Sequence, residues 1–345
     1  MKLSTKEILS KEKLNRDDII SLLKITDETD LEILFSTANY IREKYCGNEV
    51  HIRAVIEFSN YCEENCSYCE LREDNFSVKR YRLDADEIIE TAKKISNMGF
   101  RTIYLQSGED SFYDTDIIAY IIYSIKQSTD VAITLNIGQR NFEDYKTWKI
   151  AGADRYFLKF HTSNSVLYSM YHKKKNLFEK INHLKYLKRL GYQIGTGNII
   201  GIPHQTIEDI ADDIILCQEL DVDMASFTPF IPHPFTPFQN KPKADLGLVY
   251  KTIAVSRILL KNIHVHACNS LEEIGKNGRE CALKVGANII IPDFSTETNS
   301  KLLLHPSKIK KMLENTEFIS SKIELLGFKI ATSQGNSLKL KALMD

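Results

Sequence analysis

Short apolar runs alternate with longer amphipathic segments from about residue 50 onward, and this alternation constrains the fold more than any other feature of the chain. Strands that alternate with helices form parallel sheets with right-handed crossovers. Eight such units favour closure into a TIM-type (β/α)8 barrel. The runs that we interpret as strands are rich in β-branched residues and span 52–58, 102–106, 132–137, 155–159, 193–200, 224–227, 263–267 and 288–291.

The ends of the chain lack this alternation. Residues 1–50 have apolar positions at helical spacing, so we expect an N-terminal helical cap. We expect the barrel over residues 51–295 and a C-terminal helical extension, packed on the barrel, over 296–345. The main alternative is an open doubly wound sheet, whose best signal is a GxGxxG turn after the first strand. The GxGxxxG pattern at 195–201 instead falls inside the fifth predicted strand, which favours the barrel.

The first predicted strand runs into a loop with three thiols within eight residues, Cys62, Cys66 and Cys69, in the pattern CxxxCxxC. Iron–sulfur clusters are normally held by four cysteine thiolates, so three leave one iron open to a small molecule. Two alternatives stay open. One is a zinc site with a remote fourth ligand such as Cys46 or His51, and the other is a disulfide plus a spare thiol. A zinc ribbon usually has two CxxC pairs, and the single pair here favours a cluster.

Polar residues follow the other predicted strands, where the active sites of (β/α)8 barrels lie. Gly108 would let the backbone approach a ligand closely, and Glu109 suits an ammonium group. The alternative for Glu109 and Asp110 is the N-terminal cap of a helix. The polar positions are Gln106, Ser107, Gly108, Glu109 and Asp110 after the second strand, Asn136 after the third, Lys159 to Thr162 after the fourth, Thr228 and Pro229 after the sixth, and His266 to Asn269 after the seventh.

Composition limits the kinds of binding partner that we expect for this chain. A net charge of −1 gives no general attraction to a phosphate backbone, so we expect no nucleic-acid partner. The start of the chain lacks the apolar core of a signal peptide, and no apolar run approaches the length of a membrane span, so we expect a cytoplasmic protein without a membrane partner. Four cysteines are scattered outside the motif, and we expect Cys217 and Cys281 to be packed core thiols.

The CxxxCxxC loop, with Tyr68 just before its last cysteine, resembles the motif of the radical S-adenosylmethionine (SAM) superfamily. Within it, residues 50–83, 105–110, 151–156 and 229–234 resemble the HydE family, which lies beside biotin synthase and methylornithine synthase. This resemblance runs from about residue 6 to about residue 292. It implies a [4Fe-4S] cluster on Cys62, Cys66 and Cys69, with SAM bound at the open iron and cleaved reductively to a 5′-deoxyadenosyl radical.

The resemblance also implies partners and a process. Electrons would come from a donor such as ferredoxin or flavodoxin. The HydE family acts in maturation of the [FeFe]-hydrogenase H-cluster, so a small-molecule or organometallic iron substrate and other hydrogenase maturases are implied as partners.

Roles for single residues follow from the resemblance as well. Ser107, Gly108 and Glu109 would hold the methionyl ammonium of SAM, and Tyr68 would lie near the adenine. Gly197 and Ile199 resemble a strand that lines the adenine, although both could equally fill the barrel. The remaining cofactor-binding residues that it implies are Gln106, Asn136, Lys159, His161 and Lys180.

The sequence departs from the HydE family at the end of the fourth strand. Lys159 and His161 stand where that family has arginine and glutamate, and Lys180 stands where an arginine contacts the SAM carboxylate. The loop over 264–280 also differs. These departures motivate a second hypothesis, a HydE-like paralogue with another small substrate, perhaps an amino acid as in methylornithine synthase.

A third hypothesis is a non-catalytic metal-binding barrel that uses the cysteine motif for zinc. His264 and His266 point to the same face of their strand, and with Cys268 they offer a further metal site, weighed against ordinary histidines of the barrel rim.

Overall fold

A ten-stranded parallel sheet forms the centre of the molecule. The computed structural model describes residues 3–292 and 317–341. The strand order is β10-β1-β9-β8-β7-β6-β5-β4-β3-β2. All eight predicted strands are present, the first one divided at Arg53 into two, and β10 is additional. The strands are β1 (Glu49–Ile52), β2 (Ala54–Ser59), β3 (Thr102–Ser107), β4 (Ala132–Asn136), β5 (Arg155–Phe157), β6 (Gln193–Ile200), β7 (Met224–Pro229), β8 (His264–Ala267), β9 (Ile289–Ile290) and β10 (Lys329–Ile330).

The sheet closes on itself through the segment that contains β1 and β2. His51 in β1 pairs with Ile289 in β9, whereas Ala54 in β2 pairs with Ile103 in β3. Between them the N–H of Arg53 donates to the carbonyl oxygen of Ile290 over 2.9 Å. The continuous segment formed by β1 and β2 therefore pairs with β9 at its start and with β3 at its end. The predicted parallel barrel is confirmed.

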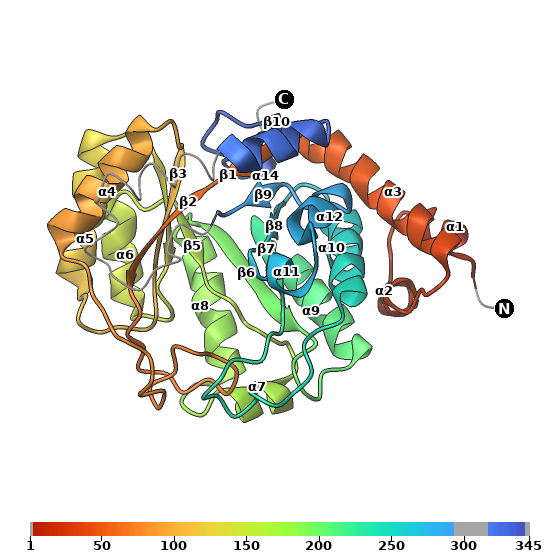
Figure 1. Ribbon diagram of the computed structural model, residues 1–345, viewed down its shortest axis with the longest axis horizontal. Coiled ribbons are helices and arrows are strands. Elements are labelled where there is room, and N and C mark those ends of the chain that lie inside the picture. The colour runs from red at the N-terminus through yellow and green to blue at the C-terminus, as the bar shows by residue number, and fades with distance from the viewer. Residues whose placement is uncertain (1–2, 293–316, 342–345) are drawn as a thin grey trace.

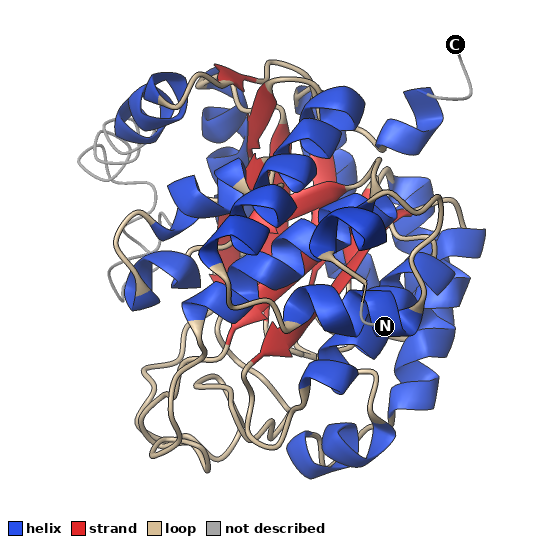
Figure 2. Cartoon of the chain, turned by 90° about the vertical axis from the view of Figure 1, so that its right-hand side faces the viewer, coloured by secondary structure: helices blue, strands red, loops and turns tan. Residues whose placement is uncertain are grey.

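Helices surround the strands (Figures 1 and 2). Their ends follow local sequence: Thr206 and Asp209 form a reciprocal capping box at the start of α9, and Gly152 ends α6 with a left-handed φ of 115°. The helices are α1 (Thr5–Leu9), α2 (Arg16–Leu23), α3 (Glu28–Cys46), α4 (Ala85–Asn97), α5 (Thr115–Ser128), α6 (Phe142–Ala151), α7 (Ser165–Tyr171), α8 (Leu177–Arg189), α9 (Ile207–Glu219), α10 (Leu246–Leu260), α11 (Ser270–Ile274), α12 (Gly278–Lys284), a helix over 317–325, and α14 (Leu338–Lys341).

Helices α2 and α3 lie against the outer wall of the barrel, and α1 packs on α3. Helix α2 packs on α9 and α3 packs on α10. Arg16 and Lys24 form ion pairs with Asp212 and Glu208 on α9, at 2.5 and 2.6 Å. The described part of this segment up to Cys46 is thus mainly helical as expected, while its role as a cap stays a prediction.

The C-terminal segment closes the end of the barrel where the strands begin, at the top of Figure 1. Lys329 in β10 pairs with Glu49 in β1. Farther along, the carbonyl oxygen of Gly335 accepts hydrogen bonds from the buried Arg53 and Arg155, at 3.0 and 3.1 Å. Much of the expected C-terminal extension, residues 296–316 and 342–345, lies outside the described residues. The part that is described combines helix, strand and loop.

The barrel interior is filled rather than open. Val55, Tyr104, Phe157 and Met224 form a small buried cluster inside it, separate from the main core between sheet and helices. A filled interior leaves the loops at the strand ends as the place for a site. None of the helices within residues 3–292 and 317–341 combines the length and apolar composition needed to cross a membrane.

Candidate functional site

The cysteine-bearing loop is fixed to the barrel by Asp110. The carboxylate of this buried residue accepts a hydrogen bond from Ser59, before the loop, at 2.6 Å, and two from Arg82, after the loop, at 2.8 Å each. Burial alone would raise the pKa of Asp110, but the hydrogen bonds from Arg82 and Ser59 outweigh it and hold the pKa below its ordinary value. The alternative that Asp110 caps a helix is wrong, because Asp114 is the cap of α5.

Gly108 brings β3 directly against the start of the cysteine motif. A Cβ atom at this position would lie 2.2 Å from the carbonyl oxygen of Tyr61 and 2.6 Å from Cβ of Cys62. We expected the absent side chain to make room for a ligand. In the structure, the backbone of the cysteine loop occupies that space.

The three motif cysteines lie close together, with partly buried side chains and free thiols. The alternative of a disulfide is therefore not realised. Burial, reinforced by Cys62, raises the pKa of Cys69 to about 12, and burial together with both neighbours raises that of Cys66. Buried thiols that suppress one another's ionisation suit a positively charged inorganic centre, which would bind them as thiolates. The donor set thus fits an iron–sulfur cluster.

The proposed remote ligands for zinc lie at the other end of the barrel. Sγ of Cys46 is 3.7 Å from the carbonyl oxygen of Ile263, before β8, and the ring of His51 packs against that of His264 at 5.0 Å. The cysteine motif follows the carboxyl end of β2. Within the described residues, no group of three or more His, Cys, Asp or Glu side chains is arranged to hold a single metal ion.

His264, His266 and Cys268 do not converge. Nε2 of His264 lies 3.1 Å from the carbonyl oxygen of Asn336 in the C-terminal segment. Nε2 of His266 lies 3.2 Å from the hydroxyl of Tyr104 inside the barrel. Both histidines are thus part of the packing, and the further metal site proposed for them is not formed. Of the two cysteines expected in the core, Cys217 is buried and Cys281 is only partly so.

A cavity of about 200 Å³ opens beside Cys62 and Cys66. Nine residues predicted from the sequence line it, namely Cys62, Cys66, Ser107, Gly108, Glu109, Asn136, Lys159, His161 and Lys180. The sequence did not single out the other lining residues, Glu64, Gly138, Phe157, Leu158, Tyr168, His172 and Lys175. Most of the predicted positions are brought together because they follow neighbouring parallel strands.

Charged groups of both signs face this cavity. The ammonium of Lys175 pairs with the carboxylate of Glu109 and lies 3.6 Å from that of Glu64. Lys180 enters from α8, and burial lowers its pKa. Lys159 donates a hydrogen bond to Thr228, and burial lowers its pKa to about 8. The cavity therefore offers carboxylates and ammonium groups to a zwitterionic ligand.

Two buried polar atoms at the cavity, Nδ1 of His161 and the hydroxyl of Tyr168, have no hydrogen-bond partner among the described residues. Buried polar groups are normally hydrogen-bonded, so unpartnered ones beside a cavity indicate where a ligand would supply the missing partner. His161 also has a left-handed φ of 68°, which is uncommon outside glycine and occurs at functional sites.

The other predicted cofactor residues are not among those that line the cavity. Gln106 accepts a hydrogen bond from Asn136 and donates one to Glu57, each of 2.8 Å, so it orients Asn136. Gly197 allows close pairing with β7, because a Cβ atom there would lie 1.9 Å from the carbonyl oxygen of Ser226. Ile199 is buried in the core, and Tyr68 lies behind the motif. Their contact with a cofactor stays a prediction.

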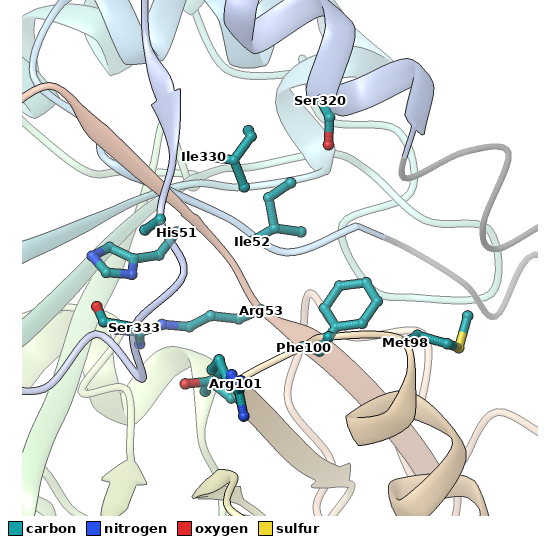
Figure 3. Close-up of a pocket in the computed structure, with 12 residues that line it drawn as sticks. His51, Ile52, Arg53, Met98, Phe100, Arg101, Ser320, Ile330 and Ser333 are labelled. Atoms are coloured by element: carbon teal, nitrogen blue, oxygen red, sulfur yellow. The ribbon is translucent and has the colours of Figure 1, made fainter.

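A second cavity, of about 140 Å³, lies at the opposite end of the barrel (Figure 3). His51, Arg53, Phe100 and Ser333 are among the residues that line it. Of the candidate site residues it contains only His51, the alternative zinc ligand, and none of the predicted cluster or cofactor residues. The chemistry suggested by the sequence is therefore confined to the end of the barrel with the cysteine motif.

Comparison with known proteins agrees with this geometry. Residues 56–217 match the model of the radical SAM superfamily. The [FeFe]-hydrogenase maturase subunit HydE of Thermotoga maritima is 43% identical over 327 residues, 94% of each chain. The 3-methylornithine synthase of Methanosarcina acetivorans is 29% identical over 80% of this chain and 79% of its own. A crystal structure of methylornithine synthase superimposes with a TM-score of 0.84 at 25% identity, covering 98% of this chain and 99% of that one.

Proposed function

The chain belongs to the radical SAM superfamily, and from this premise we propose that it is a HydE-type enzyme of [FeFe]-hydrogenase maturation. One observation carries the proposal. Two of the three motif thiols, those of Cys62 and Cys66, border a cavity at the carboxyl end of the barrel, in which Glu109 and Lys180 present charges opposite to those of an amino acid. HydE of Thermotoga maritima is similar to this chain over nearly its whole length.

Enzymes of this superfamily use a [4Fe-4S] cluster and SAM. We propose that Cys62, Cys66 and Cys69 hold the cluster, which, when bound, supplies the electron that splits SAM into methionine and a 5′-deoxyadenosyl radical. Asp110 and Gly108 hold the loop that carries the three ligands against β3. The barrel interior beneath the site is packed with apolar side chains.

The amino-acid part of SAM would bind between Glu109 and Lys180. Lys175 already places a primary ammonium against Glu109, which is the group that the methionine moiety presents. Lys180 would meet the carboxylate, with the charge but without the planar fork of an arginine. Asn136, His161 and Tyr168 then remain as polar contacts for the ribose and adenine or for the substrate.

Anaerobic reconstitution with iron and sulfide, followed by SAM and dithionite, tests the enzyme class. We expect about four irons per chain and release of 5′-deoxyadenosine, measured by mass spectrometry. Cys66→Ala should abolish both, and Cys281→Ala, which removes a thiol outside the motif, should change neither. A zinc-loaded protein that forms no 5′-deoxyadenosine would instead support the metal-binding barrel.

Addition of the reconstituted protein to an in vitro maturation mixture that lacks HydE tests the biological role. We expect it to restore hydrogenase activity together with the other maturases. We further propose that it works in the cytoplasm on an organometallic iron substrate, with an electron donor of the ferredoxin or flavodoxin type.

A HydE-like enzyme with another small substrate is the second candidate. Lys159, His161 and Lys180 favour it, since all three line the cavity where the HydE family has arginine or glutamate. Intact SAM cleavage without any restoration of hydrogenase activity would support this candidate over the first. Mass spectrometry of deuterium transfer between candidate amino acids and 5′-deoxyadenosine would then identify the substrate.

A further inference from the structure

His172 lies directly behind the cysteine motif, and nothing in the sequence singled it out. Its Nδ1 atom is 3.3 Å from Sγ of Cys66, and its Nε2 atom is 3.3 Å from the hydroxyl oxygen of Tyr68. The side chain is buried, and its ring stacks on that of Tyr168 with centroids 4.3 Å apart. A single imidazole thus contacts the sulfur of one proposed cluster ligand and the aromatic residue that precedes another.

The backbone determines the position of this ring. The N–H of Ser67, inside the motif, donates to the carbonyl oxygen of Tyr171 at the end of α7 over 3.0 Å, and the Ser67 hydroxyl donates to that of Met170 over 3.3 Å. His172 follows as the C-terminal cap of α7, and its own N–H donates to the carbonyl oxygen of Tyr168 over 2.9 Å. Helix α7 and the cysteine loop therefore hold the imidazole and the sulfur together.

Tyr68 fixes which ring nitrogen carries the proton. A neutral imidazole has one N–H, and its other ring nitrogen accepts. The hydroxyl of Tyr68, 3.3 Å away, can donate to Nε2. A cysteine bound to iron is a thiolate, which can only accept. The tautomer that satisfies both contacts has its N–H on Nδ1, directed at Sγ of Cys66.

We propose that His172 is a positioning residue for the iron–sulfur cluster, whose Nδ1–H donates a hydrogen bond to the Cys66 thiolate and makes the cluster easier to reduce. This inference rests on the proposed function, because it requires the cluster on the three cysteines. Reduction adds one electron, from the external donor, to a centre whose negative charge extends onto the thiolate sulfurs. Hydrogen bonds to those sulfurs set reduction potentials, because they stabilise the more negative, reduced state more strongly. No bond to His172 forms or breaks.

A redox titration of the reconstituted protein, without SAM, tests this role. Dithionite is the reductant, and the electron paramagnetic resonance signal of the reduced cluster is the readout. His172→Phe keeps an aromatic ring for stacking but removes the donor. We expect the equilibrium constant for one-electron reduction of the cluster to fall about tenfold in this variant, which is a shift of about 59 mV toward more negative potential. His172→Asn, which keeps an N–H donor, should recover part of this difference.

Two tyrosine variants complete the test. Tyr68→Phe leaves the imidazole in place but releases Nε2, so the proton is no longer confined to Nδ1, and we expect a smaller shift in the same direction. Tyr168→Phe removes the hydroxyl of the stacking partner without touching the sulfur or the imidazole nitrogens, and we expect no shift. If His172→Phe fails to fold or to bind iron, the Tyr68→Phe shift decides the question.

These measurements distinguish failure of the proposed function from failure of this inference. A wild-type chain that assembles no four-iron cluster overturns the proposed function and this inference with it. A wild-type chain that assembles the cluster and cleaves SAM, while the His172→Phe and Tyr68→Phe potentials equal its own, overturns the inference alone. Equal shifts in Tyr168→Phe and His172→Phe would also overturn it, because they would indicate a general effect of packing.

Discussion

Replacement of Gly108 by alanine tests whether the cysteine loop depends on direct backbone contact with β3. The new Cβ atom would lie 2.2 Å from the carbonyl oxygen of Tyr61, whereas ordinary contact begins at 3.4 Å. The loop and the strand end must therefore separate by about 1 Å, since the atom that is met belongs to the backbone and cannot rotate away. Overpacking of this kind typically costs about 1–3 kcal/mol.

The same separation would displace Cys62, whose Cβ atom is the second one that the new methyl group meets, at 2.6 Å. We therefore expect Gly108→Ala to lower the free energy of unfolding of the cluster-free protein by about 1–3 kcal/mol. We also expect it to reduce the iron bound after anaerobic reconstitution. Urea titration followed by circular dichroism measures the first effect, and iron analysis per chain measures the second.

Gly247→Ala is the matched control. Gly247 lies in the first turn of α10, where a Cβ atom would meet Asp245 at 3.4 Å, an ordinary contact. In a helix this change is neutral or stabilises by up to about 1 kcal/mol. Full iron content and unchanged stability in Gly108→Ala would refute the argument from close packing.

Three further predictions concern charged residues. Glu109→Gln should weaken SAM binding to the reconstituted protein about 10- to 100-fold in equilibrium dialysis, because a hydrogen bond to a charged group contributes about 1.5–3 kcal/mol. The control Glu63→Gln, outside the cavity, should bind SAM like wild type. Equal SAM affinities of Glu109→Gln and wild type would contradict the role of Glu109. Burial raises the pKa of Asp213 to about 7 from an ordinary 3.8. The folded chain thus holds a proton that the unfolded chain has lost, and its stability falls by up to about 1.4 kcal/mol per pH unit as pH rises from about 4 to 7. Asp213→Asn should remove this dependence in urea titrations at several pH values, and an unchanged slope would contradict the raised pKa. Burial lowers the pKa of Lys159 to about 8, so the native state disfavours its charged form. Lys159→Met should therefore be roughly 1–3 kcal/mol more stable than wild type at pH 7, and this difference in the free energy of unfolding should disappear as pH rises toward 10.5. A difference that stays constant with pH would contradict the reasoning.

Periodicity predicted most of the fold because long parallel strands buried on both faces leave continuous apolar runs. All eight predicted strands were found by this signal. Strand β10 was not, since its two residues, Lys329 and Ile330, form no run and are held by pairing with β1. Local sequence contains no information about such a distant partner.

Some residues of the site could likewise be predicted from the sequence, and others could not. Glu109, Asn136 and Lys159 were predicted because they follow strands, and a barrel brings strand ends together. His172 and Lys175 lie instead in the connection between α7 and α8, which folds back over the cysteine motif. Their place depends on tertiary contacts such as the one between Ser67 and Tyr171, and no motif marks them.

The segment that closes the end of the barrel where the strands begin has a consequence for biosynthesis. About 270 residues separate the end of β2 from β10, which at ribosomal speed is a delay of roughly 14–54 s. Until Gly335 has been synthesised, Arg53 and Arg155 lack this acceptor, and the end of the barrel where the strands begin is not yet covered. The two guanidinium groups are therefore buried together with their partner only after the segment over 329–335 has folded onto the barrel, so this end of the barrel forms late in translation.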